Sequence, residues 1–233
     1  MDMPTEAPVM TLPNAILFPQ AMVPLFIFEK RYRSMLHDVL EGNRLFAVAL
    51  QKPGRVRETP SQIAGLGLVR ASVRNRNGTS NLILQGITRV ELGPSVRTKP
   101  YRIHKLRPIA SVPAESDITE KLMVKLLDIT VKRLKQGFNF PVHPLKSSKP
   151  PISPEGQSPM VESILQSIHH LSKLNDPEQL ADLISCTLLT SPVERQVILE
   201  TADVEIRLKN LLRFLLAEIE INKINMGDAD QQD

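Results

Sequence analysis

The sequence predicts an α+β fold, with an N-terminal lobe of short antiparallel strands around one embedded helix and a C-terminal helical lobe. Short apolar runs at hairpin spacing fill the first half of the chain, and one amphipathic stripe interrupts them. Periodic helical segments begin near Pro113. Short strands joined by hairpins favour an antiparallel sheet that curls or closes. We expect a β-rich lobe at 11–112, a helical lobe at 113–225, and flexible tails at 1–10 and 226–233.

The first distinctive segment runs from Leu12 to Gly42. Its two proline-bounded apolar runs, Asn14 to Phe18 and Met22 to Phe28, are expected to be short strands. The prolines keep these strands short, because proline cannot donate to a ladder. A half-buried helix follows, with Gly42 as its left-handed stop. The apolar stripe of this helix consists of Tyr32, Met35, Leu36, Val39 and Leu40.

The remaining strands of the lobe are separated by turn signals. Asn75 to Gly78 (NRNG) is a strong hairpin signal, because Asn-Gly favours the positive backbone angles of a tight turn. Strands are predicted at Arg44 to Leu50, Leu66 to Val73, Asn81 to Gln85, Ile87 to Leu92 and Tyr101 to Arg107.

Helix starts are well marked in the second half. Ser116 is a candidate cap for a helix that ends near Gln136, and a proline-rich connector at 138–159 is expected to be extended or disordered. Helices resume near Met160. Asp176-Pro177 and the capping box Ser191 to Glu194 open two more, and the last helix is predicted from Asp203 to Ile224.

Composition limits the class of protein. The 233 residues are 42% hydrophobic and 23% charged, which is typical of a globular protein. The one cysteine, Cys186, excludes an intramolecular disulfide, and no apolar run approaches the roughly 20 residues of a membrane span. The expected location is therefore the cytoplasm, with no membrane association. Residues 52–107 carry twelve Lys or Arg against two Asp or Glu, a local charge of +10.

Signs of catalytic chemistry are missing from the sequence. No GxxxxGK[ST] phosphate-binding string occurs, and none of the five histidines has a Cys or His partner at metal-ligand spacing. The serines Ser116 and Ser191 are explained as helix caps. We predict a protein that is not an enzyme and that has no catalytic residues, no cofactor and no metal.

Three stretches together resemble one family. The start, LPNAILFPQAMVPLFIFEKRYR, resembles the opening of the Lon protease N-terminal domain, and LQGITRVEL (Leu84 to Leu92) is weakly similar to one of its strands. The segment DPEQLADLISCTLLTSPVERQVILETADVEIRLKNLLRFL is similar to the family pattern DP..LAD.IA..L.L…E.Q.LLE..DV..RL. Gln20 departs from this pattern, because the family usually has glycine there. The resemblance implies a PUA-like β pseudobarrel followed by a helical bundle, here as a stand-alone domain without the ATPase and Ser-Lys peptidase.

The resemblance implies a non-catalytic, proteolysis-related module that binds unfolded or partner polypeptides. For most of the apolar run before the helix, burial in the core is the favoured interpretation, with Met22 the best candidate for exposure. The alternative hypothesis is nucleic-acid or anionic-ligand binding through the basic residues 52–107, although that segment has only Tyr101 for base stacking. The candidate partner-binding residues are Met22, Phe26, Arg70 and Arg74. The sequence makes no prediction of oligomeric state.

Overall fold

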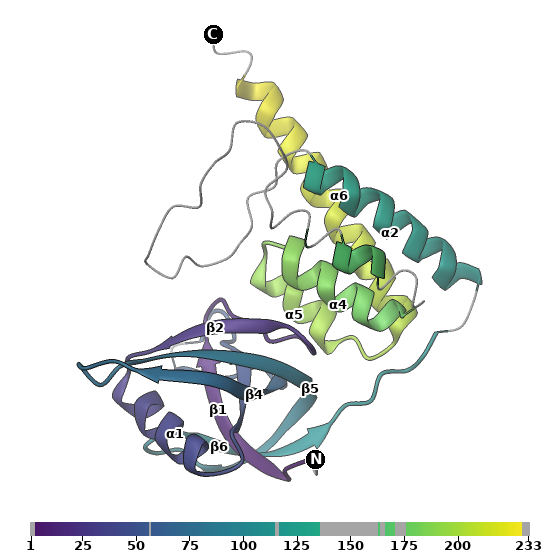
Figure 1. The fold of residues 1–233 in the computed structure, drawn as a ribbon. Coiled ribbons are helices and arrows are strands. Elements are labelled where there is room, and N and C mark those ends of the chain that lie inside the picture. Colours follow the sequence, from purple (N-terminus) through teal and green to yellow (C-terminus); the bar gives the residue numbers. More distant parts are fainter. Residues whose placement is uncertain are drawn as a thin grey trace. The chain divides into compact units, whose positions relative to one another are not determined.

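The computed structural model describes residues 3–55, 57–114, 117–135, 163, 166–170 and 176–229. Figure 1 shows the elements, whose order confirms the predicted α+β class. They are β1 (Glu6–Leu12), β2 (Met22–Ile27), α1 (Lys30–Glu41), β3 (Leu45–Leu50), β4 (Ile63–Arg74), β5 (Ser80–Arg97), β6 (Arg102–Pro108), α2 (Asp117–Lys135), α4 (Pro177–Leu188), α5 (Pro192–Glu200) and α6 (Val204–Ala229).

The chain divides into two compact units, each of which is described by itself. The barrel unit comprises Met1–Ala110 and Arg195–Ala202, and the helical unit comprises Ser111–Glu194 and Asp203–Asp233. The sequence-based boundary after residue 112 lies two residues beyond this division. The inclusion of 195–202 in the barrel unit differs from the expected uninterrupted helical lobe at 113–225.

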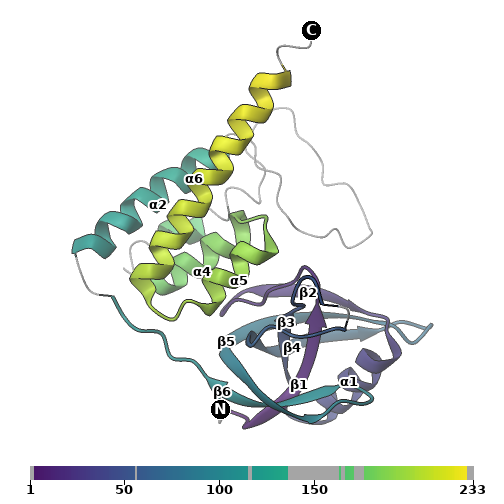
Figure 2. The same ribbon diagram turned by 180° about the vertical axis from the view of Figure 1, so that it is seen from behind.

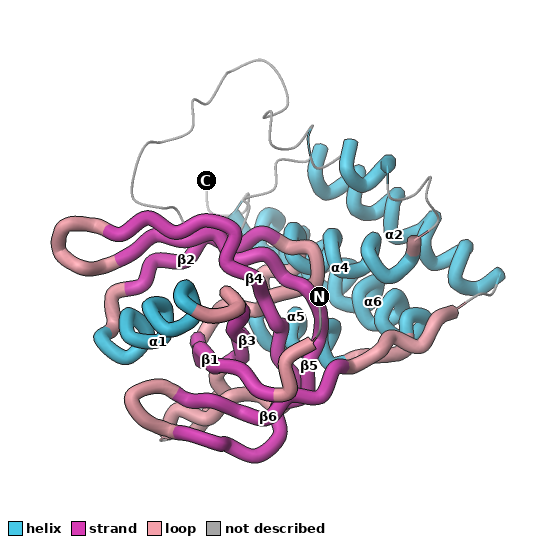
Figure 3. Tube along the Cα trace, turned by 60° about the horizontal axis from the view of Figure 1, so that its bottom comes forward, coloured by secondary structure: helices cyan, strands magenta, loops and turns pink. Residues whose placement is uncertain are grey.

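The barrel closes through one long strand. The sheet order is β2-β5-β4-β3-β1-β6, and an additional pairing of β6 with β5 closes the barrel and leaves β2 at an edge. Because β5 has 18 residues, its first part pairs with β2 and its last part with β6 (Figures 1 and 3). The β1–β3 ladder is parallel and the other five are antiparallel, which corrects the expectation of a wholly antiparallel sheet.

The N-terminal segment belongs to the sheet. The prediction of a flexible tail at 1–10 is wrong for residues 6–10, because β1 pairs with β3 on one side and with β6 on the other. Both faces of β1 are used, since Met10 and Val9 lie in different buried clusters. A strand buried on both faces shows no apolar–polar alternation, so periodicity did not reveal it.

The apolar run from Asn14 to Phe18 is not a strand, so that prediction is wrong, although its last three residues, Ile16, Leu17 and Phe18, are buried. It packs directly against glycine positions of the sheet. A Cβ atom added to Gly65 would overlap the carbonyl of Leu17, and one added to Gly86 would overlap that of Phe18. The backbone of this segment therefore occupies space that any side chain at Gly65 or Gly86 would fill.

Gln20 follows in a left-handed conformation with φ of 63°. This is the position at which the family pattern has glycine. The turn is held by hydrogen bonds, because Gln20 N–H donates to the Gly86 carbonyl (2.9 Å) and Gly86 N–H donates to the Ala21 carbonyl (2.9 Å).

Helix α1 buries four residues of the predicted stripe, Tyr32, Met35, Leu36 and Val39, in the barrel core. The prediction is wrong for the fifth, Leu40, which is exposed. The Tyr32 hydroxyl donates to the Thr11 carbonyl and accepts from the Thr11 N–H, both at 3.1 Å. Gly42 ends the helix with φ of −100°, so it is not the left-handed stop that the sequence predicted. Arg44 adopts the left-handed conformation instead, with φ of 64°.

Strands β4 and β5 form the predicted hairpin, and Gly78 in its turn has φ of 78°. The two separate strands expected at Asn81–Gln85 and Ile87–Leu92 are one continuous strand. The β4–β5 ladder has irregularities between Leu66 and Gly67 and between Val69 and Ala71. The second of these is a β-bulge that changes which side chains share a face.

In the helical unit, α2, α4 and α6 contact one another through a buried apolar core (Figure 2). The predicted caps are present, because Asp176 accepts from Gln179 N–H (2.9 Å) and Ser191 accepts from Glu194 N–H (3.3 Å). Helix α6 runs to Ala229, so the predicted tail at 226–233 is wrong for residues 226–229. The connector at 138–159 and the cap Ser116 lie outside the described residues. No helix in the described part of the chain is long and apolar enough to cross a membrane.

Candidate functional site

Strands β2, β5 and β4 present one apolar face toward the outside of the barrel. Phe26 pairs with Asn81, which pairs with Val73, so these three side chains share a face. Pro24, Ile83 and Ala71 form the neighbouring row on the same face. The opposite face of the three strands packs into the core, where Leu82, Leu84 and Val69 are buried.

The outward face carries large apolar side chains that are at least half exposed. The exposed fractions are 55% for Met22, 50% for Phe26, 60% for Phe28 and 64% for Val73. Phe26 and Phe28 stack with their ring centroids 5.9 Å apart. Phe18 and Ile27 are buried, as the core interpretation predicted, whereas it is wrong for Phe26 and Phe28. We call this surface the apolar patch, and it consists of Met22, Pro24, Phe26, Phe28, Ala71, Val73 and Ile83.

Strand β2 is at the edge of the sheet, because β5 is its only partner among the described strands. Along an antiparallel strand, alternate residues direct their N–H and C=O groups to opposite edges. Proline is accommodated where its missing N–H faces away from the partner strand, so Pro24 lies in the outward-directed set with Met22 and Phe26. The free edge of β2 therefore lacks a donor in its middle, which limits strand addition. A ligand is therefore better recognised by the side chains of β2 than by hydrogen bonds to its backbone.

The predicted basic pair of Arg70 and Arg74 is separated by the bulge. In a regular strand these residues would share a face, but the extra residue between Val69 and Ala71 reverses the alternation. Arg70 donates to the side chain of Gln85, on the apolar-patch face. Arg74 pairs with Ser80 and lies on the α1 side.

Part of the positive charge of residues 52–107 is engaged in contacts inside the protein. Buried Arg89 donates through Nε to the Leu199 carbonyl (3.2 Å), and the Lys105 ammonium pairs with Glu6 (3.2 Å). Arg107 pairs with Glu91 and holds the pKa of that carboxyl below its usual value. These contacts reduce the number of basic side chains that are free to bind a phosphate backbone.

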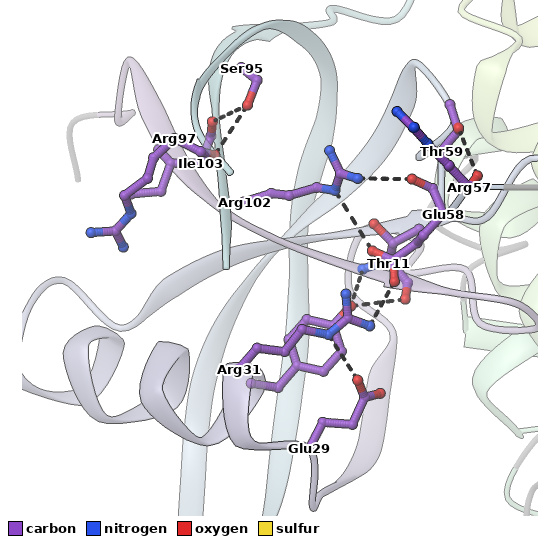
Figure 4. A network of polar contacts seen from close by, with 11 residues as sticks. Thr11, Glu29, Arg31, Arg57, Glu58, Thr59, Ser95, Arg97, Arg102 and Ile103 are labelled. Carbon is purple, nitrogen blue, oxygen red and sulfur yellow. Dashed lines mark hydrogen bonds and ion pairs between the residues drawn. The ribbon is translucent and has the colours of Figure 1, made fainter. Parts of the chain in front are cut away.

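Glu58 extends this compensation across the barrel unit (Figure 4). Its carboxylate is 2.6 Å from the guanidinium of Arg31, which also pairs with Glu29 at 2.8 Å. The Arg102 guanidinium donates to the Glu58 carbonyl at 2.9 Å. The loop after β3 is thereby tied to the first turn of α1 and to β6, so these charges hold the fold together.

The helical unit buries ion pairs that sequence reasoning missed. The Arg207 side chain is 0% exposed, and its guanidinium lies 3.6 Å from Asp182 and 3.3 Å from Glu178. Arg133 pairs with Glu218 at 2.5 Å. Both pairs join helices that are distant in the sequence, so no local spacing reveals them. Among the described residues, no group of three His, Cys, Asp or Glu side chains is placed to hold a metal ion.

The motif-rich segment of the second half has structural roles. Asp176 caps α4, Asp182 pairs with Arg207, and the Gln196 amide donates to the Ile63 carbonyl at 2.8 Å. A closed barrel unit and a helical unit define the α+β class of this protein.

The chain belongs to the family described as the ATP-dependent protease La (LON) substrate-binding domain, whose pattern matches residues 6–217. It is 28% identical to a Lon protease of Desulfosudis oleivorans over 98% of its own length and 26% of that protein. A Lon protease of Dictyoglomus thermophilum is 27% identical over 96% of the chain and 26% of the relative. The chain thus spans about a quarter of the length of these curated relatives.

Solved structures support the same fold. The N-terminal domain of a Mycobacterium avium complex Lon protease superposes with a TM-score of 0.65 at 16% identity, over 90% of this chain and 97% of that one. A Lon N-terminal domain protein from Xanthomonas campestris gives a TM-score of 0.58 at 18% identity, over 90% and 98%. The predicted family and the α+β architecture are both confirmed.

Proposed function

We propose that this protein is a non-catalytic recognition module that binds extended, apolar polypeptide segments through the apolar patch. The family description names a substrate-binding domain, which supports a role in substrate recognition. The observation that carries the proposal is the cluster of Met22, Phe26, Phe28 and Val73, all at least half exposed on one side of three strands. Contiguous exposed apolar surface of this kind marks interaction sites in proteins.

The size of the patch sets the expected affinity. Fully burying one large apolar side chain contributes roughly 2 kcal/mol of favourable free energy. Met22, Phe26, Phe28 and Val73 are already partly buried, so each can contribute about half of that value when a ligand covers it. The sum of roughly 4 kcal/mol corresponds to a dissociation constant near the millimolar range. Weak binding of single segments suits a module that samples many unfolded chains and passes them to a protease.

Peptide-binding measurements on variants of the apolar patch, with one matched control variant, test the proposal. The probe is a fluorescein-labelled peptide rich in Leu, Phe and Ser without Asp or Glu, titrated with protein and followed by anisotropy. We expect Phe26→Ser/Phe28→Ser to weaken binding by about fivefold or more and Val73→Ser by about twofold. Val124→Ser is the control, because Val124 on α2 is 67% exposed and lies outside the patch.

The control variant should bind as the wild type does. The proposal fails if the wild type shows no saturable binding up to millimolar protein. It also fails if Val73→Ser and Val124→Ser have the same effect, because binding would then not depend on the patch.

A further inference from the structure

A second concave surface lies on the opposite side of the β4–β5 hairpin from the apolar patch. It is a groove of about 620 Å³ between α1 and the hairpin, and it lies wholly within the barrel unit. Figure 3 shows α1 beside these strands. Three cationic side chains line it, Lys30 and Arg33 from α1 and Arg74 from β4.

These three cations have no ion-pair partner among the described residues, in contrast to Arg31, Arg102, Lys105 and Arg107 of the same unit. No Asp or Glu lines the groove, and no carboxylate in the described part of the chain lies within ion-pair distance of Lys30, Arg33 or Arg74. The neighbouring Glu41 pairs with His37 at 3.4 Å. The groove therefore brings three positive charges together without a carboxylate among its lining residues.

The position of Arg33 depends on the hairpin turn. Gly78 has φ of 78°, and a Cβ atom added there would overlap the guanidinium of Arg33. The side chain of Arg33 thus lies against the backbone of the turn, on the same groove as Arg74. The two guanidinium groups come from elements about 40 residues apart in the sequence, so the tertiary fold brings them together.

We propose that this groove binds an acidic polypeptide segment, whose carboxylates pair with Lys30, Arg33 and Arg74. The apolar side chain of Leu40, which also lines the groove and is 38% exposed, provides contact for an aliphatic residue of the ligand. Three hydroxyls, those of Ser34, Ser72 and Ser80, line the same groove and can bond ligand oxygens or backbone.

A peptide fits these residues better than a nucleic acid does. Single-stranded nucleic acids are held by stacking of bases on aromatic side chains, and no Phe, Tyr or Trp lines the groove. Its one aromatic ring, the imidazole of His37, pairs with Glu41 at 3.4 Å. The inference goes beyond the proposed function, because the groove and the apolar patch lie on opposite faces of the same strands and select different chemistry.

The test compares a labelled peptide of alternating Glu and Leu with its Gln counterpart, both titrated with the whole chain. We expect the Glu peptide to bind more tightly than its Gln counterpart, and Arg33→Gln/Arg74→Gln to weaken binding of the Glu peptide by about tenfold, with each single substitution giving about threefold. Binding of the Glu peptide should also weaken as salt is raised, because exposed charge pairs are screened.

Arg76→Gln is the matched control, since Arg76 lies in the turn of the same hairpin, outside the groove, and loses the same charge. It should bind the Glu peptide within about twofold of the wild type. Equal loss in Arg76→Gln and Arg74→Gln would overturn the proposal, because only net charge would then matter. Binding of a labelled oligouridylate in preference to the Glu peptide would overturn it as well.

The two proposed sites can be separated in the same assay. Phe26→Ser/Phe28→Ser should leave binding of the Glu peptide unchanged, and Arg33→Gln/Arg74→Gln should leave binding of the uncharged apolar peptide unchanged. A common loss in both assays would contradict the assignment of two independent surfaces.

Discussion

The two units of this protein differ in how they place charged and apolar side chains. The helical unit buries an ion pair, with Arg207 at 0% exposure beside Asp182 at 3%. The barrel unit leaves large apolar side chains exposed on one face of β2, β5 and β4, and a groove lined by cations on the other side. The buried ion pair stabilises the fold of the helical unit, whereas the exposed groups of the barrel unit are those to which we assign partner binding.

The largest expected effect comes from breaking a buried ion pair of the helical unit. Arg207→Met should lower the free energy of unfolding by about 3 kcal/mol or more, because Asp182 would stay buried without its counter-charge. Urea denaturation followed by circular dichroism measures this. Lys209→Met is the control, since its pair with Glu205 on the same helix is exposed and should contribute less than about 0.5 kcal/mol.

Adding Asp182→Asn to Arg207→Met should recover part of the lost stability, because the uncompensated charge is removed. If Arg207→Met lowered the free energy of unfolding as little as Lys209→Met does, the buried ion pair would contribute no more than the exposed one. The contrast between the two units would then not hold.

A smaller effect is expected in the loop beside the apolar patch. Gln20→Gly should raise the free energy of unfolding by about 1 kcal/mol, because Gln20 has φ of 63° and glycine adopts that angle without strain. Thermal denaturation measures the change, and anisotropy with the uncharged peptide should show unaltered binding. A loss of stability would mean that the side-chain contact of Gln20 with Gln85 outweighs the backbone strain.

The smallest effect concerns the pH dependence of the helical unit. Burial raises the pKa of the Glu194 carboxyl, with a further contribution from Glu218 and opposing ones from Arg133 and Arg213. The folded state then holds this proton more tightly than the unfolded state, so stability falls as pH rises above the ordinary value of 4.5. Glu194→Gln should flatten this decline in urea midpoints measured from pH 4.5 upward. Parallel profiles for the two proteins would contradict this assignment.

Local signals in the sequence were sufficient where the structure depends on local interactions. The caps at Asp176 and Ser191 and the turn at Gly78 were predicted because each depends on residues within one turn of chain. The α1 stripe was predicted for a similar reason, since helical periodicity marks the face that packs on the barrel.

The sequence-based predictions are wrong where contacts between residues distant in the sequence determine the structure. An apolar run such as Met22 to Phe28 favours a strand buried on both faces, but one face of β2 is turned away from the core, so Phe26 is exposed while Ile27 is buried. In a regular ladder, period-two alternation would place Arg70 and Arg74 on one face, and the bulge reverses it. The groove between α1 and the hairpin was not predicted, because the order of residues does not show which helix lies against which turn.

The central claim is that the apolar patch binds extended apolar polypeptide, and methyl NMR tests it most directly. Titrating the uncharged apolar peptide into methyl-labelled protein should shift the resonances of Met22, Val73 and Ile83. Leu40 in the basic groove and Val124 on α2 should remain unmoved. Shifts confined to Leu40 or Val124, with Met22, Val73 and Ile83 unchanged, would contradict the claim.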